Sequence, residues 1–178
     1  MLLLDILCIY LLEVKIMDSS GNTCKTCCFL GHREIEETDV LKTQVKSILG
    51  ELIEKNQVDT FLFGSKSQFI RLCYDVVTEL QKENPYIKRI YVRAEYPVIS
   101  DSYKSYLLEN YEATDYPAEV LGAGKAVYIK RNEAMIQRSQ FCMIYFKEGY
   151  TPKGRKSGTM IAWDYAVKHK KTIFRFPV

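Results

Sequence analysis

The residues best suited to chemistry are small polar residues that separate two apolar segments near the carboxyl end. An apolar run at residues 141–146 is followed by a polar stretch, and Ser157-Gly158-Thr159 then opens a second apolar segment. A strand, a turn of small residues and a helix start leave unpaired backbone N–H groups at the positive end of a helix dipole. Such groups bind anions, so the pattern predicts a phosphate-binding turn at residues 157–159.

Glycines, cations and amides also flank the other apolar runs. Glycine lets a ligand approach the backbone closely, and cationic or amide side chains hydrogen-bond phosphate and ribose. If the runs are parallel strands, their carboxyl ends meet at one edge of a sheet, where ligands bind. We therefore expect one nucleotide-binding site that combines residues 157–159 with Gly31, His32, Arg33, Gly64, Ser65, Lys66, Arg93, Arg131 and Asn132.

Each of these residues also has a purely structural interpretation. The glycines would only let the backbone turn, the histidine would form a hydrogen bond within its loop, and the charged side chains would form weak surface ion pairs. The ligand-binding interpretation is favoured because nearly every expected strand ends in glycine or in a cationic or amide side chain.

The elements that must position these residues alternate between strand and helix. Apolar and β-branched runs predict strands at residues 25–30, 58–63, 87–93, 141–146 and 172–176. Apolar residues three and four apart predict helices at residues 38–55, 69–80, 103–111 and 131–139, with a last one after residue 157. Hairpin signals are absent. The pattern is typical of an α/β fold: a single-domain, Rossmann-like doubly wound sheet of about five mostly parallel strands, with helices on both faces.

Composition narrows the class of protein further. The 178 residues fit one domain, and no repeat or long linker divides them. Six cysteines include one C-x-x-C at Cys24 and Cys27, but no second ligand pair accompanies it, so no metal site is expected. Buried reduced thiols are the preferred interpretation, and they indicate a cytoplasmic location.

The amino-terminal residues form an expected extension, at residues 1–23, before a domain at residues 24–178. Residues 1–16 are apolar but too short to span a bilayer, and they lack the features of a signal peptide, so no membrane association is expected. Met17 is a candidate natural start. A tyrosine-rich segment at residues 96–116 would form a lid, a face of a homodimer or ordinary packing.

Charge and motifs exclude some functions. The net charge of +3 is small, but residues 151–178 hold seven Lys or Arg and one acidic residue, so the first 150 residues sum to −3. The basic end indicates either a solvated loop or a rim for an anionic ligand. Neither G-x-G-x-x-G nor G-x-x-x-x-G-K-[ST] occurs, which disfavours classical NAD binding and ATP hydrolysis, and no cofactor is expected.

Five ordered segments of the chain resemble the SLOG superfamily, in particular its small bacterial members. They are residues 27–33, 60–70, 87–97, 130–136 and 157–166, and the likeness covers about residues 24–176. The resemblance implies a Rossmann-like fold. The superfamily includes cytokinin-activating phosphoribohydrolases, the DNA-processing protein A and sensor domains that bind nucleotide-derived signals.

The resemblance carries over only in part at the predicted phosphate turn. The phosphoribohydrolases have the pattern P-G-G-x-G-T-x-x-E there, and its Gly-Thr pair matches Gly158 and Thr159. The position of the glutamate is Ala162, which cannot transfer a proton. Asp164 lies about 200° around a helix from that position and faces elsewhere.

Three functions are therefore weighed. The first is binding or sensing of a nucleotide or nucleotide-derived small molecule. The second is hydrolysis of a nucleotide N-glycosidic bond, with Glu95 as the candidate catalytic carboxylate. The third is single-stranded nucleic acid binding by the basic end, which includes Lys153, Arg155, Lys156, Lys168, Lys170 and Lys171.

Overall fold

The alternating segments form one parallel sheet in a computed structural model, which describes residues 25–147, 149, 154 and 156–177. The expected extension at residues 1–23 and the candidate start at Met17 lie outside these residues. The strands are β1 (Lys25–Gly31), β2 (Val58–Phe63), β3 (Lys88–Val92), β4 (Ala113–Asp115), β5 (Phe141–Tyr145) and β6 (Thr172–Phe176). The predicted fold class, an α/β Rossmann-like doubly wound sheet, is confirmed.

The connecting segments contain helices, and four of the described α-helices begin at a capping side chain. The α-helices are α1 (Asp39–Glu54), α2 (Gln68–Gln81), α3 (Asp101–Asn110), α4 (Val127–Arg138) and α5 (Gly158–Lys168), and the 3₁₀ turns are η1 (Ala118–Val120) and η2 (Gly124–Ala126). Thr38, Ser67, Ser100 and Ser157 each accept a hydrogen bond from a first-turn N–H group. Such a cap stabilises a helix by about 1 kcal/mol. None of the described helices has the length and apolarity that crossing a membrane requires.

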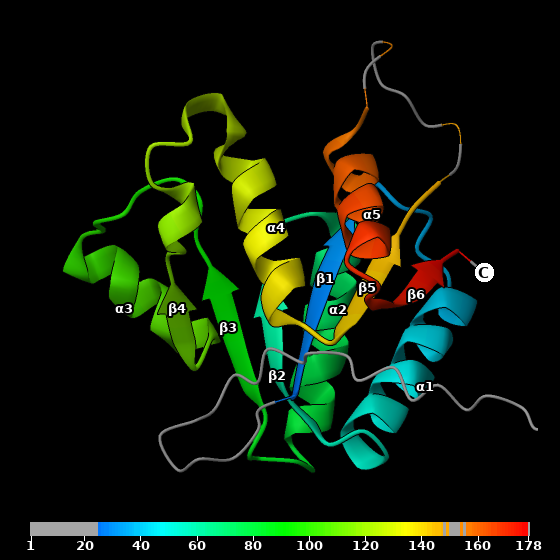
Figure 1. The fold of residues 1–178 in the computed structure, drawn as a ribbon. Helices are drawn as coiled ribbons and strands as arrows, with labels where there is room; N and C mark the ends of the chain where they lie inside the picture. Colours follow the sequence, from blue (N-terminus) through cyan, green and yellow to red (C-terminus); the bar gives the residue numbers. More distant parts are fainter. Residues whose placement is uncertain (1–24, 148, 150–153, 155, 178) are drawn as a thin grey trace, which may run out of the picture.

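The strand order fixes where the chain reverses its direction across the sheet. The order is β4-β3-β2-β1-β5-β6, and every neighbouring pair is parallel. The chain runs outward from β1 to β4 and then returns to β5 on the other side of β1. The switch in strand order therefore lies between β1 and β5. All strands end at one edge, the upper one in Figure 1, which we call the carboxyl edge.

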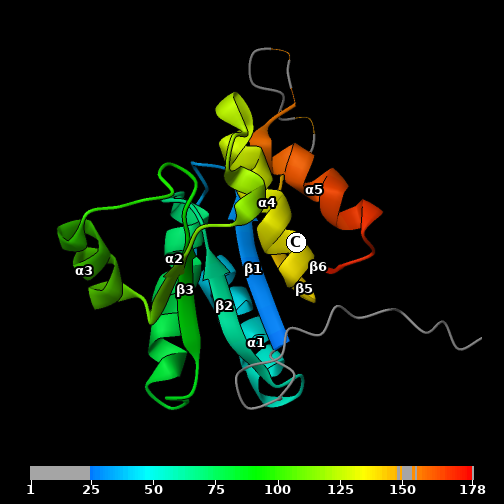
Figure 2. The same ribbon diagram turned by 60° about the vertical axis from the view of Figure 1, so that its left-hand side comes forward.

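Two apolar cores hold the layers together. α1 and α2 cover one face of the sheet, and α4 and α5 cover the other (Figure 1). The first core contains seven buried rings: Phe29, Phe61, Phe63, Phe69, Tyr91, Tyr145 and Phe176. The second contains Leu30, Met135, Ile144, Ala162 and Ala166. Burial of each large side chain contributes about 1.5–3 kcal/mol. α3 packs beside β4, at the end of the sheet (Figure 2).

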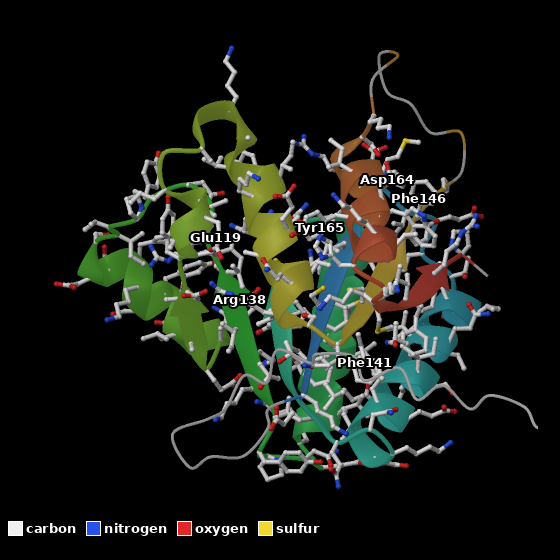
Figure 3. The ribbon with its side chains drawn as sticks, in the orientation of Figure 1. Glu119, Arg138, Phe141, Phe146, Asp164 and Tyr165 are labelled. Atoms are coloured by element: carbon white, nitrogen blue, oxygen red, sulfur yellow. The ribbon has the colours of Figure 1, made fainter. Side chains whose placement is uncertain are left out.

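Two details of the elements differ from the sequence prediction. The sheet has six strands, because β4 joins β3 through a three-residue, half-buried segment without an apolar run. Helix α4 begins at Val127 rather than at residue 131, and its first turn has no capping side chain. Arg138, near the end of α4, forms ion pairs with Asp115 and with Glu119, so it fixes the returning chain to β4; Figure 3 labels Arg138 and Glu119.

The described cysteines are buried and free. They are Cys27, Cys28, Cys73 and Cys142. Burial raises the pKa of the Cys27 and Cys73 thiols well above the ordinary value. The Sγ atoms of Cys28 and Cys142 lie 3.6 Å apart on neighbouring strands. These thiols act as small apolar side chains of the cores.

A buried ion pair joins β3 to the residue before β4 on the α2 face. Arg89 Nη2 donates to Glu112 Oε1 at 2.7 Å, and its Nη1 donates to Thr78 and to the Tyr74 hydroxyl. Burial alone raises the pKa of Glu112, but hydrogen bonds from Arg89 and Gln81 outweigh burial and bring the pKa to about 2. The carboxylate is therefore stabilised by its partners in the folded protein.

We expect Glu112→Gln to flatten the acid side of the stability profile. The folded pKa of Glu112 is depressed from 4.5, so its contribution is fully present above pH 4.5 and is lost as the pH falls through 2. The side chain is 36% exposed, so the contribution is about 1–2 kcal/mol rather than the full shift. Urea unfolding between pH 7 and pH 2 measures it, with the exposed Glu109→Gln as control. Parallel profiles for wild type and Glu112→Gln would contradict the expectation.

Candidate functional site

Arg131, on α4, is a buried cation without a carboxylate partner. Its side chain is only 3% exposed. Nη1 donates to the carbonyl of Val92 at 3.3 Å, and Nε donates to Asn132 Oδ1 at 2.9 Å. The ring of Tyr128 lies 5.9 Å from the guanidinium. Among the described residues no carboxylate forms an ion pair with it.

Among the described residues no ion pair neutralises the positive charge of Arg131, although the charge of Glu95 acts on it. Burial lowers the pKa of the guanidinium, although an arginine stays protonated in proteins. Nη2 makes no hydrogen bond with the part of the chain that the structure describes, and it is not enclosed, so it faces accessible space. A buried charge is costly unless an opposite charge accompanies it. An anion at Nη2 would supply that charge.

Gly64, after β2, has no side chain and so leaves space for the side chain of Arg131. A Cβ on Gly64 would lie 2.7 Å from Arg131 Cδ and Nε and 2.6 Å from Met135 Sδ. Glycine is therefore needed here for the close approach of α4 to the end of β2. Two residues that the sequence placed in one site are thus in direct contact.

The start of α5 faces the same edge. Ser157 is the N-cap, and its Oγ accepts a hydrogen bond from the N–H of Met160 at 3.0 Å. The N–H groups of Gly158 and Thr159 have no acceptor within the described residues, as expected for a first turn. Gly158 is exposed, and a Cβ there would meet nothing within 4 Å. Because α5 packs against α4, these N–H groups and Arg131 lie on the same face of the sheet.

Gly31 and His32 are engaged in packing at the switch in strand order. A Cβ on Gly31 would lie 2.9 Å from Phe69 Cδ1, on the α2 face. His32 Nε2 accepts a hydrogen bond from the N–H of Lys147 at 3.2 Å. Its ring stacks on Phe146, which stacks on Trp163. Burial, and then the charge of Lys147, lowers the pKa of His32, so the imidazole is a neutral structural link between β1 and β5.

The cations after the strands have different environments. Arg33 and Lys66 are exposed, and Ser65 is half-buried. Arg93 Nη1 donates to the carbonyls of Tyr96 and Pro97 at 2.8 and 3.3 Å, so this residue holds the loop after β3. Arg93 therefore has a structural partner, whereas Lys66 has no ion pair within the described residues.

The carboxylates near this edge are few. Glu95 is exposed, its Oε2 accepts from the N–H of Ala94 at 3.4 Å, and its charge acts on Arg131 without forming an ion pair. Ala162, at the position that the resemblance aligns with a catalytic glutamate, is 2% exposed and lies in the second core. Asp164, labelled in Figure 3, pairs with Lys156 at 2.7 Å.

The basic end of the chain is divided by α5. Lys156 precedes the helix, whereas Lys168, Lys170 and Lys171 lie at or beyond its end. Eleven helical residues span about 16 Å, so the two groups face opposite edges of the sheet. Lys153 and Arg155 lie outside the described residues.

The sequence did not predict that Arg131 is buried, or that Val92 and Tyr128 contact it. A signal was present, because Arg131 precedes the buried residues Ala134 and Met135 by three and four positions and so lies on their helix face.

No group of three or more His, Cys, Asp or Glu that could hold a metal occurs in the described ranges. A scan against protein-family models found no match, and a search of curated proteins found none either.

Proposed function

We propose that the protein binds a phosphate-bearing small molecule, a nucleotide or a nucleotide derivative, at the carboxyl edge. The observation that carries the proposal is the buried guanidinium of Arg131, which has no ion-pair partner among the described residues and turns Nη2 toward accessible space. Phosphate is one of the two anions, with carboxylate, that arginine binds with two parallel hydrogen bonds. The resemblance to the SLOG superfamily supports the same class of ligand.

The other groups at this edge complete a phosphate site. The free N–H groups of Gly158 and Thr159 lie at the positive end of the α5 dipole, on the face that holds Arg131. Lys66 adds an exposed positive charge after β2. Hydrogen bonds to a charged group contribute about 1.5–3 kcal/mol each. A phosphate that bridges Arg131 and the first turn of α5 would therefore bind with useful affinity.

Binding without catalysis is favoured over hydrolysis. The α5 position of a catalytic carboxylate holds Ala162, whose side chain lies in the apolar core and cannot reach a ligand. Glu95 is the remaining carboxylate near Arg131, because its charge acts on that residue. An N-glycosidic hydrolase that uses Glu95 is the alternative function.

The test separates phosphate binding from hydrolysis. Purified protein is titrated by calorimetry with AMP, UMP, ADP-ribose and ribose 5-phosphate, with adenosine and uridine as controls without phosphate. We expect the phosphates to bind at least about tenfold more tightly than the nucleosides, in line with one charged hydrogen-bonded contact. Equal binding of nucleosides and nucleotides, or no binding of any phosphate, would refute the proposal.

The same samples test the two alternatives. Chromatography of AMP, ADP-ribose and NAD after incubation shows whether free base is released. Turnover that Glu95→Gln abolishes would identify a hydrolase. Binding of a single-stranded oligonucleotide that weakens steeply with salt, and exceeds the binding of the mononucleotides, would instead identify a nucleic-acid-binding protein.

A further inference from the structure

A cavity lined by tyrosines lies on the α2 face of the sheet, under α3. Its volume is about 140 Å³. Its walls come from α2, β3 and α3, and they consist of Tyr74, Tyr91, Tyr106, Leu107, Asn110 and Tyr111, with Lys66 beside them. Tyr91 and Leu107 in its walls also belong to the first core, whereas the proposed phosphate site does not use this hollow. It accounts for part of the tyrosine-rich segment, whose role the sequence left open.

The size and walls of the cavity suit one planar ring. A dry protein cavity of about 150 Å³ is large enough for benzene. The rings of Tyr74 and Tyr111 have centroids 5.2 Å apart, and those of Tyr91 and Tyr111 are 5.3 Å apart. Aromatic walls at these spacings favour stacked or edge-on contacts with a further ring. A bicyclic purine would exceed the volume that a monocyclic ring fills.

The polar groups of the cavity are available to a ligand. The Tyr74 hydroxyl is engaged, because it donates to the carbonyl of Asn110 at 2.7 Å. The hydroxyls of Tyr91, Tyr106 and Tyr111 make no hydrogen bond within the described residues, and none of them is enclosed without a partner. They therefore reach accessible space. Such hydroxyls can donate to the carbonyl or ring nitrogen of a heterocycle.

The cavity adjoins the phosphate site across the ends of β2 and β3. Lys66 lines the cavity and lies two residues after Gly64, which contacts Arg131. Tyr91 lines the cavity and precedes Val92, whose carbonyl accepts from Arg131. Burial raises the pKa of Tyr91 to about 12, and the charges of Glu95 and Arg131 also act on its phenol. Lys66 and Tyr91 therefore connect the cavity to the carboxyl edge that holds Arg131.

We propose that the tyrosine cavity binds the ring of the ligand whose phosphate is held at Arg131, so that the ligand carries a monocyclic aromatic ring such as a pyrimidine. This inference rests on the proposed phosphate site. It assigns the cavity the role of selecting monocyclic over bicyclic rings. Tyr106 and Asn110 of α3 then form the outer wall of the ring site.

The experiment compares UMP, AMP and ribose 5-phosphate by calorimetry, and uridine by NMR. Stacking on aromatic side chains contributes about 1–3 kcal/mol for a base, so UMP should bind at least about fivefold more tightly than ribose 5-phosphate. The affinity of AMP should exceed that of ribose 5-phosphate by a smaller factor than the affinity of UMP does. Tyr106 is 51% exposed. Tyr106→Ala should remove the higher affinity of UMP and leave the affinity for ribose 5-phosphate unchanged.

The matched control is Tyr86→Ala, which removes a ring of similar exposure, 55%, at a position outside the cavity. It should leave all affinities unchanged. Equal binding of UMP and ribose 5-phosphate, or a gain that survives Tyr106→Ala, overturns the ring site and leaves the phosphate site standing. Uridine binding that depends on Tyr106, with no binding of ribose 5-phosphate, overturns the phosphate site instead and shows that the cavity binds a ring by itself. Absence of all binding overturns both.

Discussion

Arg131→Gln is expected to reduce phosphate affinity by at least about a hundredfold and to leave the unliganded protein as stable as the wild type. The affinity falls because the principal positive charge of the site is removed, and a charge-assisted contact of this kind is worth about 3 kcal/mol. Stability is kept because the buried guanidinium has no ion-pair partner in the part of the chain that the structure describes, and a neutral side chain removes its desolvation cost. Calorimetry and urea unfolding measure the two effects.

The control for this prediction is Arg89→Gln. Arg89 is also buried, but its guanidinium is paired with Glu112, so its removal leaves a carboxylate without its partner. We expect a loss of about 1–3 kcal/mol in the free energy of unfolding, with unchanged phosphate affinity. If both variants were destabilised equally and bound phosphate normally, Arg131 would be a structural residue.

Gly64→Ala is expected to destabilise the protein by about 1–3 kcal/mol and to weaken phosphate binding. The new Cβ would lie 2.6–2.7 Å from side-chain atoms of Met135 and Arg131. Both side chains are buried and cannot move aside freely, so the substitution overpacks the contact between α4 and the end of β2. Displacement of the guanidinium would disturb the proposed phosphate site. Urea unfolding and calorimetry with UMP measure both consequences.

Gly50→Ala makes the same chemical change as Gly64→Ala and is expected to have the opposite effect on stability. Gly50 lies inside α1, and a Cβ there would meet nothing within 4 Å. Alanine should stabilise the helix by about 0.5–1 kcal/mol without altering phosphate binding. A loss of stability from both glycine substitutions would contradict the steric explanation for Gly64.

The fold could be predicted from the sequence where local patterns specify the strands and the helix caps. The buried strands are continuous apolar runs, and Thr38, Ser67 and Ser157 cap the helices that follow three of them. Strand β4 could not be predicted, because a three-residue edge strand depends on pairing with β3 rather than on its own pattern. The start of α4 was missed because Ala126 offers no capping side chain.

The site was predictable only in part. Gly64 and Arg131 were placed together because strand ends in a parallel sheet share an edge, and the structure brings them into contact. The packing role of Gly31 depends on Phe69 and Tyr145, which are distant in the sequence, so no local pattern reveals it. The tyrosine cavity is likewise built from three elements. Binding itself stays a prediction.

The central strand pair has a consequence for how the chain folds. β1 and β5 are neighbours, although Cys28 and Cys142 in their register are 114 residues apart. During synthesis β1 to β4 can assemble with α1 and α2, while Leu30, Leu62 and Val92 stay uncovered until α4 and α5 emerge. Contacts between such distant segments slow folding. The incomplete sheet exposes an apolar face until α4 and α5 have been synthesised. Chaperones that recognise apolar surface would act on the nascent chain at this stage.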